Sequence, residues 1–166
     1  VSIVNSPETA KRAESLSVKA IPWHEQALAL RKELDDKIGV GDSLMRLGEA
    51  YAYSPNHEKR FEYFELALTV FRAAQWLPGQ RLALMRLGNS YGANSQFDKA
   101  VTYYEEILSL SKTPSVADIQ ILQRLAEFYS DMENYDKAIE YQEKLLQVSQ
   151  NAKVLPSVAL TLRSLS

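Results

Sequence analysis

Three arginines stand at the same place in a motif that the chain repeats. Arg46, Arg86 and Arg124 each hold the third position of a Leu-x-Arg-Leu-small-x-x-Tyr sequence, at spacings of 40 and 38 residues. A guanidinium offers a rigid fork of hydrogen-bond donors that fits carboxylates, and it also binds backbone carbonyls. Arginine chemistry that recurs with each repeat therefore indicates ligand binding.

Each arginine shares a helical face with four other side chains. The five positions follow i, i+3, i+4, i+7 and i+11, which one side of an α-helix brings together. The methionines in these sets would give adaptable apolar contact, and an asparagine can donate and accept hydrogen bonds. The sets are Asp42, Met45, Arg46, Glu49 and Tyr53; Leu82, Met85, Arg86, Asn89 and Ala93; and Gln120, Gln123, Arg124, Glu127 and Asp131.

Two of the arginines have a second interpretation. Arg46 can pair with Glu49, and Arg124 with Glu127, since both carboxylates lie three residues further along the helix. Such pairs contribute only about a few tenths of a kcal/mol and would leave ordinary surface salt bridges. Arg86 faces Asn89 instead, so we expect it to be the least neutralised of the three and the strongest single candidate.

Catalytic and metal-binding patterns are missing from the sequence. The two histidines, His24 and His57, fall in different repeats, and there is no cysteine. No Gly-rich phosphate loop and no Gly-x-Ser-x-Gly turn occurs. Adjacent carboxylates such as Glu105 and Glu106 point in different directions on a helix. The sequence therefore predicts a protein that is not an enzyme and that needs neither a cofactor nor a metal.

Two helices per repeat position these side chains. In the first, which we call the opening helix, Leu44, Leu47, Gly48 and Tyr51 follow i, i+3, i+4 and i+7 and form a packing stripe. The small residue recurs in the later repeats and predicts close approach of the second, or closing, helix. The closing helices are predicted from the related segments at 60–68, 100–108 and 138–146.

The repeated residues resemble the tetratricopeptide repeat family, in a longer variant with units of about 40 residues. Leu87-Gly88, Tyr91, Ala100, Tyr104 and Ile107-Leu108 match the family signature closely. The chain departs from it where leucines replace the first-helix Trp, Arg60 replaces a small residue and Gln142 replaces an aromatic. The resemblance implies an all-α, right-handed solenoid of antiparallel helix pairs.

The resemblance also implies that the opening helices line a concave groove and that stacking aligns the three arginines in one column. Such a column would suit an extended or acidic peptide. The Lys-containing carboxylate clamp of some family members is not expected, because Met45 and Met85 stand at its positions. The candidate peptide-binding residues are Met45, Arg46, Glu49, Tyr53, Met85, Arg86, Asn89, Gln123, Arg124 and Glu127.

The repeats divide the chain into a single solenoid domain over 1–166. Full repeats are expected at 41–80, 81–118 and 119–158, after a divergent leading helical pair at 1–40 with an N-cap near Ser6. Pro22 either separates the two helices of that pair or kinks one long helix. Residues 159–166 are predicted to be either the start of a further repeat in a longer protein or a capping helix.

Charge and hydropathy limit the class of partner. Nineteen basic residues oppose 21 acidic ones, which does not favour nucleic acid, and no apolar run is long enough to cross a bilayer. We expect a cytoplasmic protein. Trp76, before Pro78-Gly79, is interpreted as a plug between repeats at a turn, with an exposed partner anchor as the alternative.

The sequence thus predicts a non-enzymatic scaffold or adaptor that binds a protein partner through an extended or acidic peptide segment in its concave groove. Two alternatives stay open. The chain could be a sensory or regulatory segment of a larger signalling protein, or an assembly module that self-associates through its terminal helices.

Overall fold

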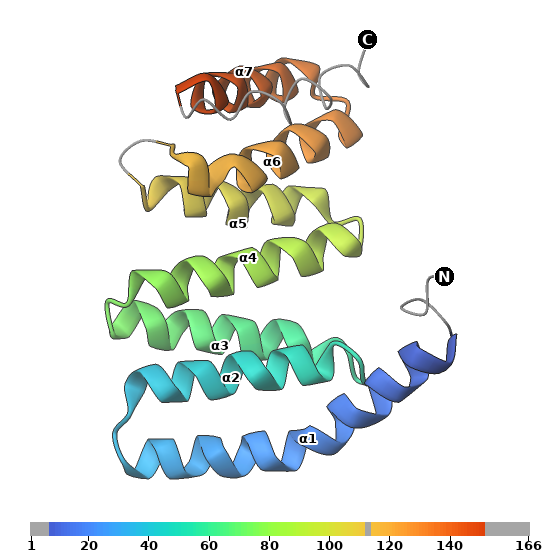
Figure 1. Ribbon diagram of the computed structural model, residues 1–166, viewed down its shortest axis with the longest axis vertical. Helices are drawn as coiled ribbons and strands as arrows, with labels where there is room; N and C mark the ends of the chain where they lie inside the picture. Colours follow the sequence, from blue (N-terminus) through green and yellow to red (C-terminus); the bar gives the residue numbers. More distant parts are fainter. Residues whose placement is uncertain (1–6, 112–113, 152–166) are drawn as a thin grey trace. The chain divides into compact units, whose positions relative to one another are not determined.

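The computed structural model describes residues 7–111 and 114–151, and within these ranges it is all-α (Figure 1). Helices joined by short turns follow one another in a helical-repeat fold, and the described residues contain no β-strand. The elements are α1 (Pro7–Glu33), α2 (Lys37–Tyr51), α3 (Lys59–Ala73), α4 (Leu77–Ala93), α5 (Phe97–Ser109), the 3₁₀-helix η2 (Val116–Asp118), α6 (Ile119–Asp131) and α7 (Tyr135–Asn151).

Two compact units divide the chain, Val1–Leu87 and Gly88–Ser166. The first contains α1, α2, α3 and the beginning of α4. Within it, α2 packs against both α1 and α3. The second contains the end of α4, then α5, η2, α6 and α7, and here α6 packs against α5 and α7.

The predicted packing stripes are buried in both units. Leu47, Leu87 and Leu125 are 0% exposed, and Phe64, Phe71 and Tyr104 of the closing helices are at most 2% exposed. A Cβ atom on Gly48 would collide with the Phe64 ring of α3, and one on Gly88 would come within 2.9 Å of Tyr104. The small residues therefore do allow close helix approach, as the sequence predicted.

One turn geometry recurs between helices. In each case a non-glycine residue adopts the left-handed conformation, with φ between 51° and 57°. The next amide then donates back to a carbonyl five residues earlier, which satisfies a helix C-terminus. The left-handed residues are Asp35, Gln75, Ser95 and Glu133.

In each of the three repeats, a pair of stacked tyrosine rings joins the opening helix to the closing helix. The rings are nearly parallel, with centroids 5.2 to 5.6 Å apart, and a lysine ammonium lies 4.7 to 5.3 Å from the first ring. The lysine always follows the first tyrosine by eight residues and precedes the second by four, a pattern that sequence reasoning did not identify. The sets are Tyr51, Lys59 and Tyr63; Tyr91, Lys99 and Tyr103; and Tyr129, Lys137 and Tyr141.

The predicted leading helical pair is wrong. Residues Pro7–Glu33 form one helix, α1, with Pro22 inside it, so the proline does not separate two helices. The helix bends along its length (Figure 1), as expected where a proline removes a backbone hydrogen bond. The N-cap expected near Ser6 and the trailing helix expected at 159–166 lie outside the described residues.

The sequence placed a turn at Pro78-Gly79, and the structure corrects this. Both residues belong to the first turn of α4, where proline is accommodated because its missing N–H would have no helical partner. Trp76 immediately precedes α4, and its side chain is half-buried. The centroid of its ring lies 4.9 Å from that of Phe71. It packs inside the first unit, in agreement with the predicted plug.

Candidate functional site

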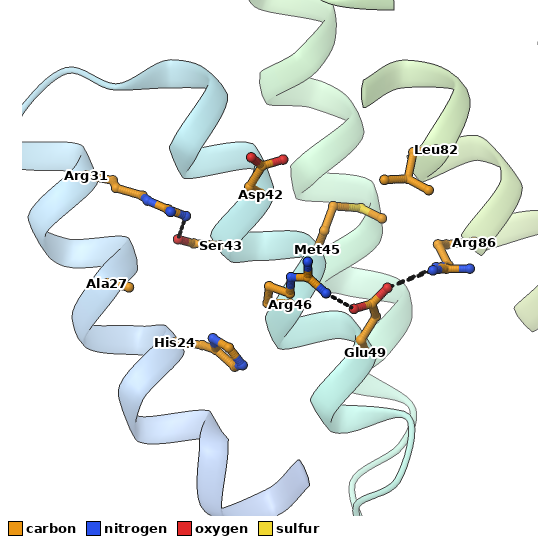
Figure 2. A pocket seen from close by; sticks show the side chains of 10 residues that line it. All are labelled: His24, Ala27, Arg31, Asp42, Ser43, Met45, Arg46, Glu49, Leu82 and Arg86. Carbon is orange, nitrogen blue, oxygen red and sulfur yellow. Dashed lines mark hydrogen bonds and ion pairs between the residues drawn. The ribbon is translucent and has the colours of Figure 1, made fainter. Parts of the chain in front are cut away.

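A cavity of about 450 Å³ opens in the first unit between α1, α2 and the beginning of α4. Figure 2 shows its lining, with α1 on one side, α2 in the middle and α4 on the other side. Three arginines and His24 face two carboxylates and a few small or apolar side chains. The lining residues are His24, Ala27, Arg31, Asp42, Ser43, Met45, Arg46, Glu49, Leu82 and Arg86.

Glu49 joins two of the predicted arginines. Its Oε1 accepts from Nε and Nη2 of Arg86 at 3.1 and 2.9 Å, and its Oε2 accepts from Nη1 of Arg46 at 3.2 Å (Figure 2). The expectation that Arg86 is the least neutralised arginine is therefore wrong. Helix packing brings it to a carboxylate 37 residues away, which intrahelical spacing could not indicate.

Arg46 is the most accessible cation of this group. Its side chain is 66% exposed, against 39% for Arg86 and 31% for Glu49. Its hydrogen bond to Glu49 joins neighbouring turns of one helix, and such an exposed ion pair is weak in water. Arg46 can therefore exchange this bond for one to a ligand at low cost.

Arg31 fixes the α1 side of the cavity. Its Nη1 donates to the backbone oxygen of Gly39 at 2.9 Å and to Oγ of Ser43 at 2.7 Å. These bonds hold the end of α1 on the beginning of α2. Sequence reasoning did not select Arg31 or Ser43, since neither belongs to the arginine motif.

Two glycines show that α1 stands where a closing helix stands in the later repeats. A Cβ on Gly39 would meet Asp36 and Arg31, and a Cβ on Gly79, forty residues later, would meet Trp76 and Phe71. The neighbours of the two glycines are themselves forty residues apart. His24, Ala27 and Arg31 of α1 therefore correspond to Phe64, Ala67 and Phe71 of α3.

The corresponding positions have opposite environments. Phe64, Ala67 and Phe71 are 2%, 0% and 0% exposed, and Cβ atoms on Gly48 and Gly41 of α2 would meet the rings of Phe64 and Phe71. In α1, the residues at these positions line the cavity instead. α1 has the polar residues His24 and Arg31 where α3 has phenylalanine. This difference between the repeats could have indicated from the sequence that the positions on α1 are not buried.

Met45 and Tyr53, two other predicted site residues, do not lie where the sequence placed them. Met45 is only 4% exposed, so it contributes to the core as well as to the cavity wall. Tyr53 lies beyond the end of α2 and is 57% exposed, and it does not line the cavity. The i+11 spacing failed because the helix ends at Tyr51.

The predicted site residues of the second unit form hydrogen bonds within that unit. Asn89 accepts from the hydroxyl of Tyr104 at 2.7 Å, which fixes its amide. Glu127 accepts hydrogen bonds from Arg124 at 3.1 Å and from Gln123 at 3.3 Å.

The alternative interpretation, in which each arginine pairs with the carboxylate three residues further along its helix, is thus correct for both Arg46 and Arg124. Met85, the remaining predicted site residue, is half-buried in the first unit.

A cluster of tyrosines and one carboxylate joins α5, α6 and α7 of the second unit. Oε1 of Glu105 accepts from the hydroxyls of Tyr129 at 2.7 Å and Tyr141 at 2.9 Å, and Lys137 donates to Tyr129 at 3.0 Å. Burial, followed by the hydrogen bond to Glu105, raises the pKa of both phenols. The cluster is closed by its own members and acts structurally.

The described residues hold no group of three or more His, Cys, Asp and Glu side chains that could bind a metal ion. None of the helices described is long and apolar enough to span a bilayer.

The family model of the tetratricopeptide repeat matches residues 83–114 and 119–151. A crystal structure of nearly identical TPR-like repeats, from a Podosopora anserina protein described as a kinesin light chain, has a TM-score of 0.66 and 21% sequence identity. The match covers 90% of the present chain and 75% of the Podosopora anserina chain. A single-substitution variant of the same repeats has the same TM-score and identity, with coverages of 90% and 74%. No curated protein matches the chain. At this identity the structural likeness establishes the fold.

Proposed function

Because the chain belongs to the tetratricopeptide repeat family, whose repeats generally mediate protein–protein interaction, we propose that it is a non-enzymatic scaffold that binds an acidic segment of a partner protein. The binding site is the cavity between α1, α2 and α4 in the first unit. The cytoplasmic location expected from the sequence stays a prediction.

The observation that carries the proposal is the composition of this cavity. Three arginines and a histidine line it, against the carboxylates of Asp42 and Glu49. The three arginines outnumber the two carboxylates, so the lining keeps an excess of one positive charge. An acidic segment is therefore favoured over a basic one.

The arginines keep donors for a ligand. A guanidinium has five N–H groups, and Arg86 uses Nε and Nη2 on Glu49, while Arg31 uses Nη1 on Gly39 and Ser43. Arg46 is mostly exposed. A carboxylate that enters the cavity can therefore accept hydrogen bonds while Glu49 remains in place.

The test is a titration with acidic peptides selected from a random library on the intact chain. Arg46→Ala is compared with Arg124→Ala, which removes an arginine of the same motif position with the same i+3 pairing. Circular dichroism first confirms that the variants have equal helicity. We expect only Arg46→Ala to weaken binding, and the wild-type affinity to fall as salt rises.

Loss of affinity in both variants would instead support the column of arginines predicted from sequence. Peptides that bind all three proteins equally, at all salt concentrations, would overturn the proposal. The absence of any selected peptide would do the same.

A further inference from the structure

The two carboxylates that line the cavity differ in what they bind. The oxygens of Glu49 are held by Arg46 and Arg86. Asp42, in contrast, forms no hydrogen bond or ion pair with any residue that the structure describes. Its side chain is partly buried in the wall that α2 provides. One carboxylate of the lining is therefore available to a ligand.

The arginines beside Asp42 are directed to other groups. Arg46, four residues further along α2, binds Glu49. Arg31 of α1 donates to the backbone oxygen of Gly39 and to Oγ of Ser43, and Figure 2 shows the second of these bonds next to Asp42. Neither arginine therefore depends on Asp42 for its position.

Asp42 also does not stabilise the beginning of its own helix. α2 begins at Lys37, so Asp42 is its sixth residue and lies beyond the first turn. The helix dipole favours carboxylates only within that first turn. The capping role belongs to Asp36, whose side chain accepts from the amide of Gly39 at 2.9 Å. Neither helix capping nor ion pairing within the chain therefore accounts for Asp42.

A segment bound in the cavity would exclude water from Asp42. A carboxylate that loses water without gaining a donor carries a desolvation penalty, and an acidic side chain opposite it would add repulsion. A basic side chain avoids both costs. We propose that the cavity selects a segment in which a lysine or arginine binds Asp42 while an acidic residue binds Arg46. This inference rests on the proposed function and specifies which acidic segments bind.

The spacing of Asp42 and Arg46 predicts the spacing of the two ligand residues. Four residues of a helix rise about 6 Å. An extended chain returns to the same side every second residue, after about 6.7 Å. The basic residue should therefore lie two positions from the acidic one. The residue between them points away from α2, so its type is not selected.

Parallel selections test this pattern. A random peptide library is selected on the wild-type chain and on Asp42→Asn, after circular dichroism has confirmed equal helicity. The wild-type chain should enrich peptides in which a lysine or arginine lies two residues from an aspartate or glutamate, on either side. Asp42→Asn should enrich acidic peptides without this pattern.

Titrations then measure the contribution of the basic residue. The tightest wild-type peptide is synthesised with lysine, glutamine or glutamate at that position. On the wild-type chain, the glutamine form should bind about two- to fivefold more weakly than the lysine form, as for a partly exposed ion pair. The glutamate form should be weaker than the lysine form by more than about fivefold, because like charges repel. On Asp42→Asn, the three forms should differ by less than about twofold.

Asp98→Asn is the matched control. Asp98 is exposed in the first turn of α5, in the second unit, and is not among the residues that line the cavity. Its replacement changes the net charge of the chain by the same amount as Asp42→Asn. The three peptide forms should keep their wild-type order on this control.

Selected peptides that bind through Arg46 but carry no basic residue at the expected spacing would overturn the inference and leave the proposed function intact. The three forms could also keep their wild-type order on Asp42→Asn. That result would overturn the inference as well, since another group would then recognise the basic residue. If neither selection yields a peptide, the proposed function itself fails.

Discussion

Glu49 on α2 and Arg86 on α4 are joined by two hydrogen bonds of 3.1 and 2.9 Å, although 37 residues separate them. The same carboxylate holds Arg46 through its other oxygen. Glu49 therefore occupies acceptor positions that a ligand carboxylate would otherwise take. It competes with the ligand for the two arginines.

Glu49→Gln should increase affinity for acidic peptides, because it removes one negative charge and releases both arginines. Its cost in unfolding free energy should stay below about 1 kcal/mol, since the groups are partly exposed. Peptide titration and urea denaturation measure the two effects. Glu127→Gln is the control, and equal gains in both variants would show that only net charge matters.

Gly48→Leu should destabilise the first unit by several kcal/mol, because Phe64 already occupies the space of a Cβ. Thermal or urea unfolding measures the change. Ala29→Leu adds the same side chain on the exposed face of α1 and should be nearly neutral. An unchanged midpoint for Gly48→Leu would disprove the tight packing of α2 on α3.

Gln75→Gly should stabilise the chain by about 0.5–1 kcal/mol. Gln75 has φ of 53°, which costs a side-chain-bearing residue about 1–2 kcal/mol and glycine almost nothing, while glycine loses more entropy on folding. Ala73→Gly, two residues earlier in α3, should instead destabilise. Urea midpoints that move in the same direction for both variants would contradict the turn geometry.

Stability should fall at alkaline pH through the Glu105 cluster. The pKa values of Tyr129 and Tyr141 are raised in the folded state, so their contribution is complete below the ordinary value of 10.0. It is lost as pH rises from there toward the folded pKa, because the unfolded chain releases these protons first. Unfolding free energies at several pH values measure the slope.

Tyr129→Phe/Tyr141→Phe should flatten this alkaline loss, whereas Tyr135→Phe, at a 61% exposed position, should leave it unchanged. Identical slopes in all three proteins would assign the alkaline loss to other groups, such as lysines.

The sequence anticipated more of the fold than of the site. Leu44, Leu47 and Gly48 predicted a buried stripe and a close helix contact correctly, because helical periodicity and side-chain size act locally and recur in each repeat. For Arg46, the pairing with Glu49 was a correct alternative for the same reason. Tyr53 was misplaced because a spacing rule holds only while the helix continues.

The sequence by itself determined the repeat period, the two helices of each repeat and the chemistry of the recurring arginines, since these follow from residue types at fixed local spacing. Only the tertiary structure decided that Arg86 binds Glu49, that α1 continues through Pro22 as one helix, and that His24 lines an open cavity. Each of these depends on which helices pack together. That choice is made by contacts between residues far apart in the chain, which local spacing does not encode.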